Sequence, residues 1–149
     1  MDELKLVVER RIDASPAAVW TAMTERMPEW FCPAPWTCEV TALDWRPGGR
    51  SAMVFRGPDG EAMPQDGVVL EVAPGRRFVF SDAYREGWIP ATPFVTTIWE
   101  VEPDGDGSLY RATARHWTRE AYDQHLAMGF EAGWGAAADQ LKALCEAGR

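Results

Sequence analysis

Between residues 37 and 116 the chain repeats one pattern, a short run rich in β-branched and aromatic residues followed by a proline- and glycine-containing turn. The turns stand at 46–49, 57–60, 73–75 and 103–107. Proline fixes φ and glycine tolerates positive φ, so these segments are typical of tight connections. Short consecutive strands joined in this way form an antiparallel meander. The pattern predicts strands near 37–44, 50–56, 65–72, 76–82, 93–102 and 108–116.

The residues before this region predict one strand and two short helices. Residues 3–12 alternate apolar and charged side chains, which predicts a first strand with one buried face. Ser15 followed by Pro16 is typical of a helix start, because serine caps the first turn and proline needs no hydrogen bond there. Pro28 ends or interrupts that helix, and a second short helical turn is expected at 27–31.

The C-terminal side has a helical period. Thr118 is a candidate N-cap, and Glu120 stands in the first turn, where negative charge is favourable. Apolar or small residues then recur at spacings of three and four: Leu126, Phe130, Gly133, Trp134, Ala137, Leu141 and Leu144. These residues predict one long amphipathic helix over about 119–146.

Composition restricts the function. The chain has 149 residues and no linker or repeat, so it is expected to form a single domain over 1–149. A net charge of −8 without a basic stripe disfavours nucleic acids and anionic membranes as partners. No apolar run approaches the ~18 residues of a membrane helix, and the first residues lack signal-peptide character, so a cytoplasmic location is expected.

The cysteines and histidines form no metal motif. Cys32, Cys38 and Cys145 are an odd number without CxxC spacing, which fits a reducing compartment and buried apolar thiols. His116 and His125 match no zinc-binding spacing. The chain also lacks a phosphate-binding glycine loop and a nucleophile elbow, so neither a cofactor nor a metal is predicted.

Four segments together resemble a known family. They are 12–20 (Ile-Asp-Ala-Ser-Pro-Ala-Ala-Val-Trp), 46–49 (Arg-Pro-Gly-Gly), 58–61 (Pro-Asp-Gly-Glu) and 129–134 (Gly-Phe-Glu-Ala-Gly-Trp). In this order they are similar to bacterial proteins like the C-terminal domain of the activator of Hsp90 ATPase, in the START-like superfamily, also called SRPBCC or Bet v 1-like.

The resemblance implies an α+β helix-grip fold. A curved seven-stranded antiparallel sheet would wrap around a long C-terminal helix, with two short helices after the first strand. A cavity would lie between sheet and helix, where superfamily members hold lipids, sterols, polyketides or plant hormones. The resemblance implies no common catalytic residue.

Strand parity suggests which residues line such a cavity. Tyr110, Ala112, Ala114 and His116 share one face of their strand, and Trp99 is assigned to the same inner surface. Arg111, Thr113 and Arg115 are expected to face solvent. Small residues opposite the helical glycines Gly129 and Gly133 would leave volume unfilled. The predicted lining is Trp20, Tyr84, Trp88, Phe94, Trp99, Tyr110, His116, Phe130 and Trp134.

Three functions remain open at this level. The first is a binding protein for a small apolar or amphipathic molecule, favoured by the aromatic residues and the lack of a catalytic constellation. The second is an enzyme that uses His116 with Tyr84, Asp82 or Glu100 for acid–base chemistry. The third, a chaperone-accessory or stress-response protein with an Hsp90-type partner, depends on family analogy alone. A homodimer is also left open.

Overall fold

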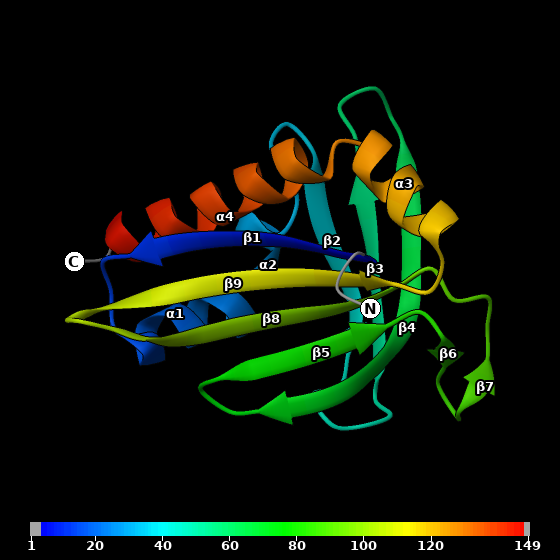
Figure 1. Ribbon diagram of the computed structural model, residues 1–149, viewed down its shortest axis with the longest axis horizontal. Coiled ribbons are helices and arrows are strands. Elements are labelled where there is room, and N and C mark those ends of the chain that lie inside the picture. The colour runs from blue at the N-terminus through cyan, green and yellow to red at the C-terminus, as the bar shows by residue number, and fades with distance from the viewer. Residues whose placement is uncertain (1–3, 148–149) are drawn as a thin grey trace.

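The computed structural model describes residues 4–147, so Glu3, which belongs to the predicted first strand, lies outside the described residues. A mixed set of strands and helices follows along the chain (Figure 1). The elements are β1 (Lys5–Ile12), α1 (Pro16–Glu25), α2 (Met27–Trp30), β2 (Thr37–Leu43), β3 (Arg50–Arg56), β4 (Ala62–Ala73), β5 (Arg77–Ser81), β6 (Tyr84–Arg85), β7 (Ile89–Pro90), β8 (Val95–Asp104), β9 (Gly107–His116), α3 (Arg119–Ala127) and α4 (Phe130–Ala147).

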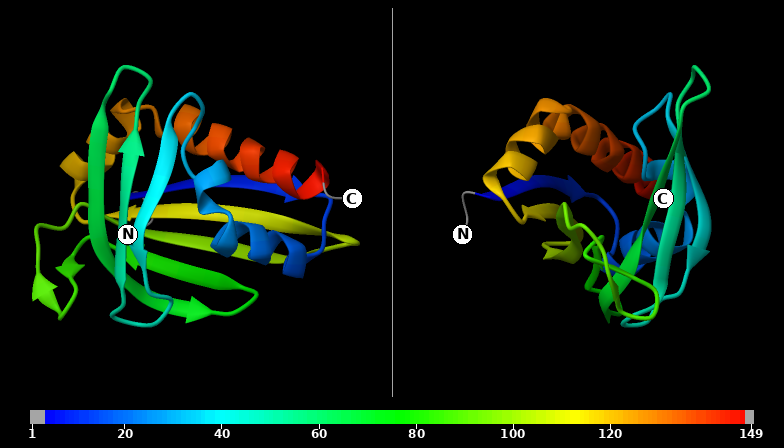
Figure 2. Two further views of the ribbon diagram at one scale, coloured as in Figure 1. Left: turned by 180° about the vertical axis from the view of Figure 1, so that it is seen from behind. Right: turned by 90° about the vertical axis from the view of Figure 1, so that its right-hand side faces the viewer.

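Seven strands form one antiparallel sheet in the order β1-β9-β8-β5-β4-β3-β2. After β1 the chain crosses through α1 and α2 to the opposite edge, and the remaining strands return as a meander until β9 pairs with β1. Register shifts in β2 and β4 mark bulges, which bend a sheet. Figure 2 shows the resulting curvature, with α3 and α4 on the concave side. The helix-grip prediction is confirmed.

Local signals explain the helix starts. The Ser15 side chain accepts a hydrogen bond of 3.2 Å from the amide of Ala18, and Pro16 occupies the first turn of α1. The Thr118 hydroxyl accepts one of 3.0 Å from the amide of Ala121 at the start of α3. Both predicted caps are therefore confirmed, and the short helix predicted at 27–31 is present as α2.

The single C-terminal helix predicted over 119–146 is wrong in one respect, because the structure has two helices there. Gly129 separates them with φ of +89°, a left-handed conformation that an α-helix does not contain. The regular spacing of apolar residues hides this break. The structure also contains the small β6–β7 ribbon, which the sequence pattern did not predict.

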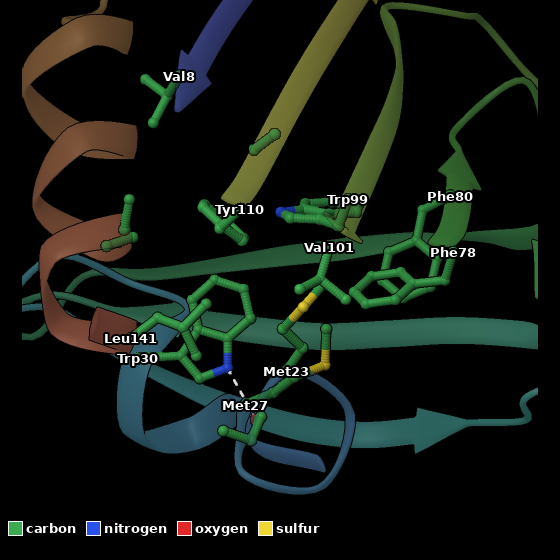
Figure 3. Close-up of a cluster of buried hydrophobic side chains, with 14 of the residues drawn as sticks. Val8, Met23, Met27, Trp30, Phe78, Phe80, Trp99, Val101, Tyr110 and Leu141 are labelled. Carbon is green, nitrogen blue, oxygen red and sulfur yellow. Dashed lines mark hydrogen bonds between the residues drawn. The ribbon is translucent and has the colours of Figure 1, made fainter. Parts of the chain in front are cut away.

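The concave face of the sheet forms the core with α1, α2 and α4. The predicted inner set is confirmed, because Trp99, Tyr110, Ala112 and Ala114 are all buried. Figure 3 shows Trp99 and Tyr110 on adjacent strands facing Trp30 and Leu141, while Met23 and Met27 fill the space below. These side chains fix the distance between the sheet and α4.

The convex face is mostly charged. Arg111 on β9 pairs with Glu9 at 2.7 Å and with Glu100 at 3.8 Å. Thr113 departs from the prediction of solvent exposure, since it is buried on this face. In the strand register it lies between Val7 of the edge strand β1 and Ile98 of β8, and these branched side chains shield it.

Candidate functional site

A pocket of about 420 Å³ lies between the concave face of the sheet and α4. The strands contribute its floor, and the segment after α2 contributes one side through Cys32, Pro33 and Trp36. Four lining residues, Met63, Gln65, Met128 and Gly129, are exposed. They place its mouth between the β3–β4 hairpin and the junction of α3 with α4.

Aromatic rings supply most of the wall. Trp99 on β8 and Trp134 on α4 are stacked, with ring centres 5.7 Å apart and planes 6° apart. The ring centre of Phe130 lies 4.6 Å from that of Trp134, and the ring centre of Phe31 lies 5.2 Å from that of Trp99. Such a surface gives a flat apolar molecule a large contact area.

The glycines of the helical segment keep this space empty. Gly129 and Gly133 both border the pocket. A Cβ built on Gly133 would meet only the Pro33 ring, at 3.9 Å, which is an ordinary contact distance. A larger side chain at this position would therefore extend into free volume.

Polar groups border one side of the pocket, and the protein already engages several of them. Asp82 accepts hydrogen bonds from the amides of Phe94 and Val95 at 2.9 and 3.2 Å through Oδ1. Asp66 pairs with Arg50 at 3.2 Å. Ser81 accepts hydrogen bonds from the Ala83 amide and the Thr96 hydroxyl. These groups support the wall of the pocket.

Two histidines meet at the end of the pocket near α3. The Nε2 atom of His116 lies 2.7 Å from Nδ1 of His125, and Nδ1 of His116 lies 2.9 Å from the carbonyl oxygen of Leu4. Of the pair, only His125 borders the pocket. Burial, followed by the charge of the neighbouring His116, lowers the pKa of His125 to about 4. His125 is therefore neutral near pH 7.

Two of the three cysteines fit the prediction of buried free thiols. Cys32 and Cys38 are buried, and Cys145 is half-buried. The hydrogen bond to Cys38 and then burial raise the pKa of the Cys32 thiol. Burial is also the main cause that raises the pKa of Cys145. Within residues 4–147 no group of histidine, cysteine and acidic side chains could hold a metal ion.

Five of the nine predicted lining residues border the pocket: Phe94, Trp99, Tyr110, Phe130 and Trp134. Parity along β8 and β9 indicates Trp99 and Tyr110, helical spacing indicates Phe130 and Trp134 on α4, and Phe94 lies directly before β8. Whether they contact a ligand stays a prediction.

The other four residues lie elsewhere. Trp20 on α1 packs its ring edge-on against Phe78, 5.9 Å away, at the other end of the core. Tyr84 and Trp88 belong to the β6–β7 ribbon and are exposed, and Trp88 lies over Gly48 instead of the pocket. His116 lies behind His125.

The acid–base constellation considered from the sequence does not assemble. Glu100 lies on the convex face with Arg77 and Arg111, whereas Asp82 lies at the pocket and Tyr84 on the exposed ribbon. The two ring nitrogens of His116 are hydrogen-bonded to Leu4 and His125, and neither is bonded to Tyr84, Asp82 or Glu100. An enzyme that uses His116 with these partners is therefore not supported.

Sequence reasoning missed His125, Phe31 and Phe55, which border the pocket. In a continuous helix of 3.6 residues per turn, His125 would lie about 140° around the axis from Phe130. The break at Gly129 removes this offset and brings their rings to 5.1 Å. Phe31 follows α2 directly, and its proximity to Trp99 depends on the crossing between the two sheet edges.

The model of the family described as "Activator of Hsp90 ATPase homolog 1-like protein" matches residues 13–146. The chain belongs to this family. The match begins directly after β1 and covers the other strands, the residues that line the pocket and the C-terminal helices up to Glu146. It confirms the resemblance seen in the sequence motifs.

Solved structures of bacterial proteins agree with the family assignment. A protein from Nitrosomonas europaea is 34% identical, with a TM-score of 0.88 over 98% of this chain and 96% of that one. One from Mycobacterium smegmatis is 26% identical, with a TM-score of 0.80 over 96% and 91%. A protein of the same family from Silicibacter pomeroyi, at 18% identity and a TM-score of 0.73 over 97% and 99%, shares the fold.

No curated protein matches the chain. Among the helices of residues 4–147, none is both long enough and apolar enough to cross a membrane. The family membership defines the fold, and the residues of the pocket determine the chemistry of the site.

Proposed function

We propose that the protein binds a small, mainly apolar molecule in the pocket between the sheet and α4. The observation that carries the proposal is the unfilled volume of about 420 Å³ lined by aromatic side chains. Pockets for small ligands commonly have roughly 300–1,000 Å³ and combine apolar walls with a few polar groups. The stacked Trp99 and Trp134 rings and the neighbouring Phe31 and Phe130 supply such walls.

Binding explains the composition of the pocket better than acid–base catalysis. Catalysis of that kind requires two titratable groups within reach of one substrate atom. Here the carboxylate of Asp66 is paired with Arg50, and one oxygen of Asp82 holds two backbone amides. The pocket offers contact area and orientation to a bound molecule.

The experiment blocks the pocket from α4. Gly133→Leu places a side chain in the free volume beside Pro33 and adds a good helix former. Ala132→Leu is the matched control, because Ala132 is the preceding residue of α4, is exposed and does not border the pocket. Binding of the neutral fluorescent probe N-phenyl-1-naphthylamine is measured by titration, and the stoichiometry by native mass spectrometry.

The wild type and Ala132→Leu should bind one probe molecule with similar affinity. Gly133→Leu should bind at least about tenfold more weakly, since the leucine side chain occupies volume that the probe needs. If the probe does not bind the wild type, or if Gly133→Leu leaves the affinity unchanged, the pocket is not a binding site for such molecules.

A further inference from the structure

His125 is the polar group that the pocket encloses most closely with aromatic rings. Its ring centre lies 5.4 Å from that of Phe94, 5.1 Å from Phe130 and 5.8 Å from Trp134. All four residues border the pocket. A ligand that lies against these rings therefore meets an imidazole edge.

The hydrogen bonds of the pair determine which atoms carry protons. A carbonyl oxygen only accepts, so Nδ1 of His116 must donate its hydrogen to the oxygen of Leu4. When His116 is neutral, its Nε2 atom is then bare and accepts from Nδ1 of His125. In that arrangement neutral His125 has its hydrogen on Nδ1, so its own Nε2 atom carries a lone pair and no hydrogen.

That Nε2 atom has no partner within the protein and is accessible. Among residues 4–147 no hydrogen bond is recorded for it, and no buried side-chain nitrogen or oxygen there lacks a partner. His125 is half-buried, so its unpartnered Nε2 atom cannot be enclosed by protein and remains accessible. The low pKa of His125 keeps the lone pair available at neutral pH.

We propose that Nε2 of His125 is the hydrogen-bond acceptor of the pocket and selects a flat, uncharged aromatic molecule bearing a hydroxyl group. The inference builds on the proposed binding function and names its ligand class. The hydroxyl donates to Nε2, while the ring of the ligand packs on the aromatic wall that includes Trp134 and Phe130.

The charges of the pocket favour a neutral ligand over an anionic one. Its ionisable side chains besides His125 are Cys32, Asp66, Asp82 and Tyr110, none of which is cationic. A carboxylate ligand would meet a lone pair at His125 and two aspartates, without a positive charge from the lining residues. A phenolic hydroxyl keeps both the donor and the neutrality that this environment requires.

Three probes of one shape test the inference: 2-naphthol donates a hydrogen bond, 2-methoxynaphthalene only accepts, and naphthalene does neither. Their affinities are measured for the wild type, for His125→Phe and for His125→Gln, which keeps a side-chain acceptor. For the wild type we expect 2-naphthol to bind roughly fivefold more tightly than 2-methoxynaphthalene, the effect of one neutral hydrogen bond. His125→Phe should abolish this preference, and His125→Gln should retain part of it.

The wild type alone supplies a second readout. The protein has two histidines, so ¹⁵N NMR of histidine-labelled protein resolves their ring nitrogens. We expect a bare Nε2 signal from His125 that shifts on addition of 2-naphthol and hardly moves with naphthalene. This measurement does not depend on whether a variant folds.

The outcomes separate the two proposals. If the three probes bind the wild type equally well and His125→Phe changes none of them, the pocket binds aromatic molecules but His125 is not its acceptor. A protonated Nε2 in the NMR spectrum at neutral pH overturns the inference in the same way. If none of the probes binds, the binding function itself fails, and the ligand class fails with it.

Discussion

The indole rings of Trp99 and Trp134 stack across the boundary between the sheet and α4, with planes 6° apart and ring centres at 5.7 Å. Trp99 is buried and also stacks on Phe78 at 5.1 Å, so its position is fixed from the sheet side. Trp134 is only half-buried and borders the pocket. The buried indole of Trp99 therefore holds the half-buried indole of Trp134 in place.

Trp134→Ala should weaken probe binding, because it removes the exposed half of this stack from the wall. A loss of about 1 kcal/mol, or roughly fivefold in affinity, is expected for one aromatic contact. Trp88→Ala is the control, since Trp88 is equally aromatic but lies over Gly48 on the exposed ribbon. Equal effects of the two substitutions in a probe titration would contradict the assigned position of the pocket.

Gly129 and Gly133 should respond to alanine in opposite directions. Gly129 has φ of +89° with no atom near a built Cβ, so Gly129→Ala costs only backbone strain, about 1–2 kcal/mol. Gly133 lies inside α4 with room for a methyl group, and Gly133→Ala should stabilise by about 0.5–1 kcal/mol. Urea denaturation of both variants measures the difference. A stabilising Gly129→Ala would show that the helix break is not required.

Gln140 should be important for the wall formed by the segment after α2. Its amide nitrogen donates to the carbonyls of Trp30 and Cys32 at 3.0 and 2.8 Å, and its oxygen accepts from the Ala34 amide at 2.8 Å. Gln140→Leu removes all three bonds and should lower the free energy of unfolding by about 2 kcal/mol, with weaker probe binding.

Gln140→Glu is the second variant for that prediction, because it keeps the acceptor for Ala34 and loses the donor. Its second carboxylate oxygen would face the carbonyl oxygens of Trp30 and Cys32, which also only accept, so its stability should be lower than that of the wild type. If both variants unfold at the same urea concentration as the wild type, the three bonds do not hold the segment in place.

The stability of the protein should depend on His125 below neutral pH. The folded-state pKa of about 4 lies below the ordinary value of 6.5, so the unfolded state binds more protons between these values. The contribution of neutral His125 is therefore complete above about pH 6.5 and is lost as the pH falls towards 4. Burial is the main cause, and proximity to His116 adds to it.

Urea denaturation at several pH values between these limits measures this loss. Carboxylates also titrate at acid pH, so the informative quantity is the difference between the wild type and His125→Gln. The variant should lose less stability over the same range. Identical pH dependence would show that His125 titrates normally in the folded protein.

The strands were predictable because proline and glycine in the turns between them specify where each strand ends. Proline and glycine at 46–49 and 103–107 mark hairpins regardless of what packs around them, and alternation along β9 identifies Tyr110, Ala112 and Ala114 as buried. The break at Gly129 was not predictable in this way, because its flanking apolar residues keep a helical spacing. His125 borders the pocket because of that break, and His116 does not because it is hydrogen-bonded to the carbonyl of Leu4. Leu4 lies far away in sequence, so this contact could not be predicted either.

The pairing of β1 with β9 has a consequence for how the protein is made. Lys5 lies opposite Arg115, and Arg10 of β1 bonds to Asp139 of α4. During synthesis the first strand therefore has to wait, without its partner strand, until β9 has left the ribosome. Contacts between such distant residues slow folding and leave strand edges exposed while they form. The pocket can be assembled only after α4 has been made, so a nascent chain of this protein should depend on protection from aggregation for longer than a helical protein of the same length.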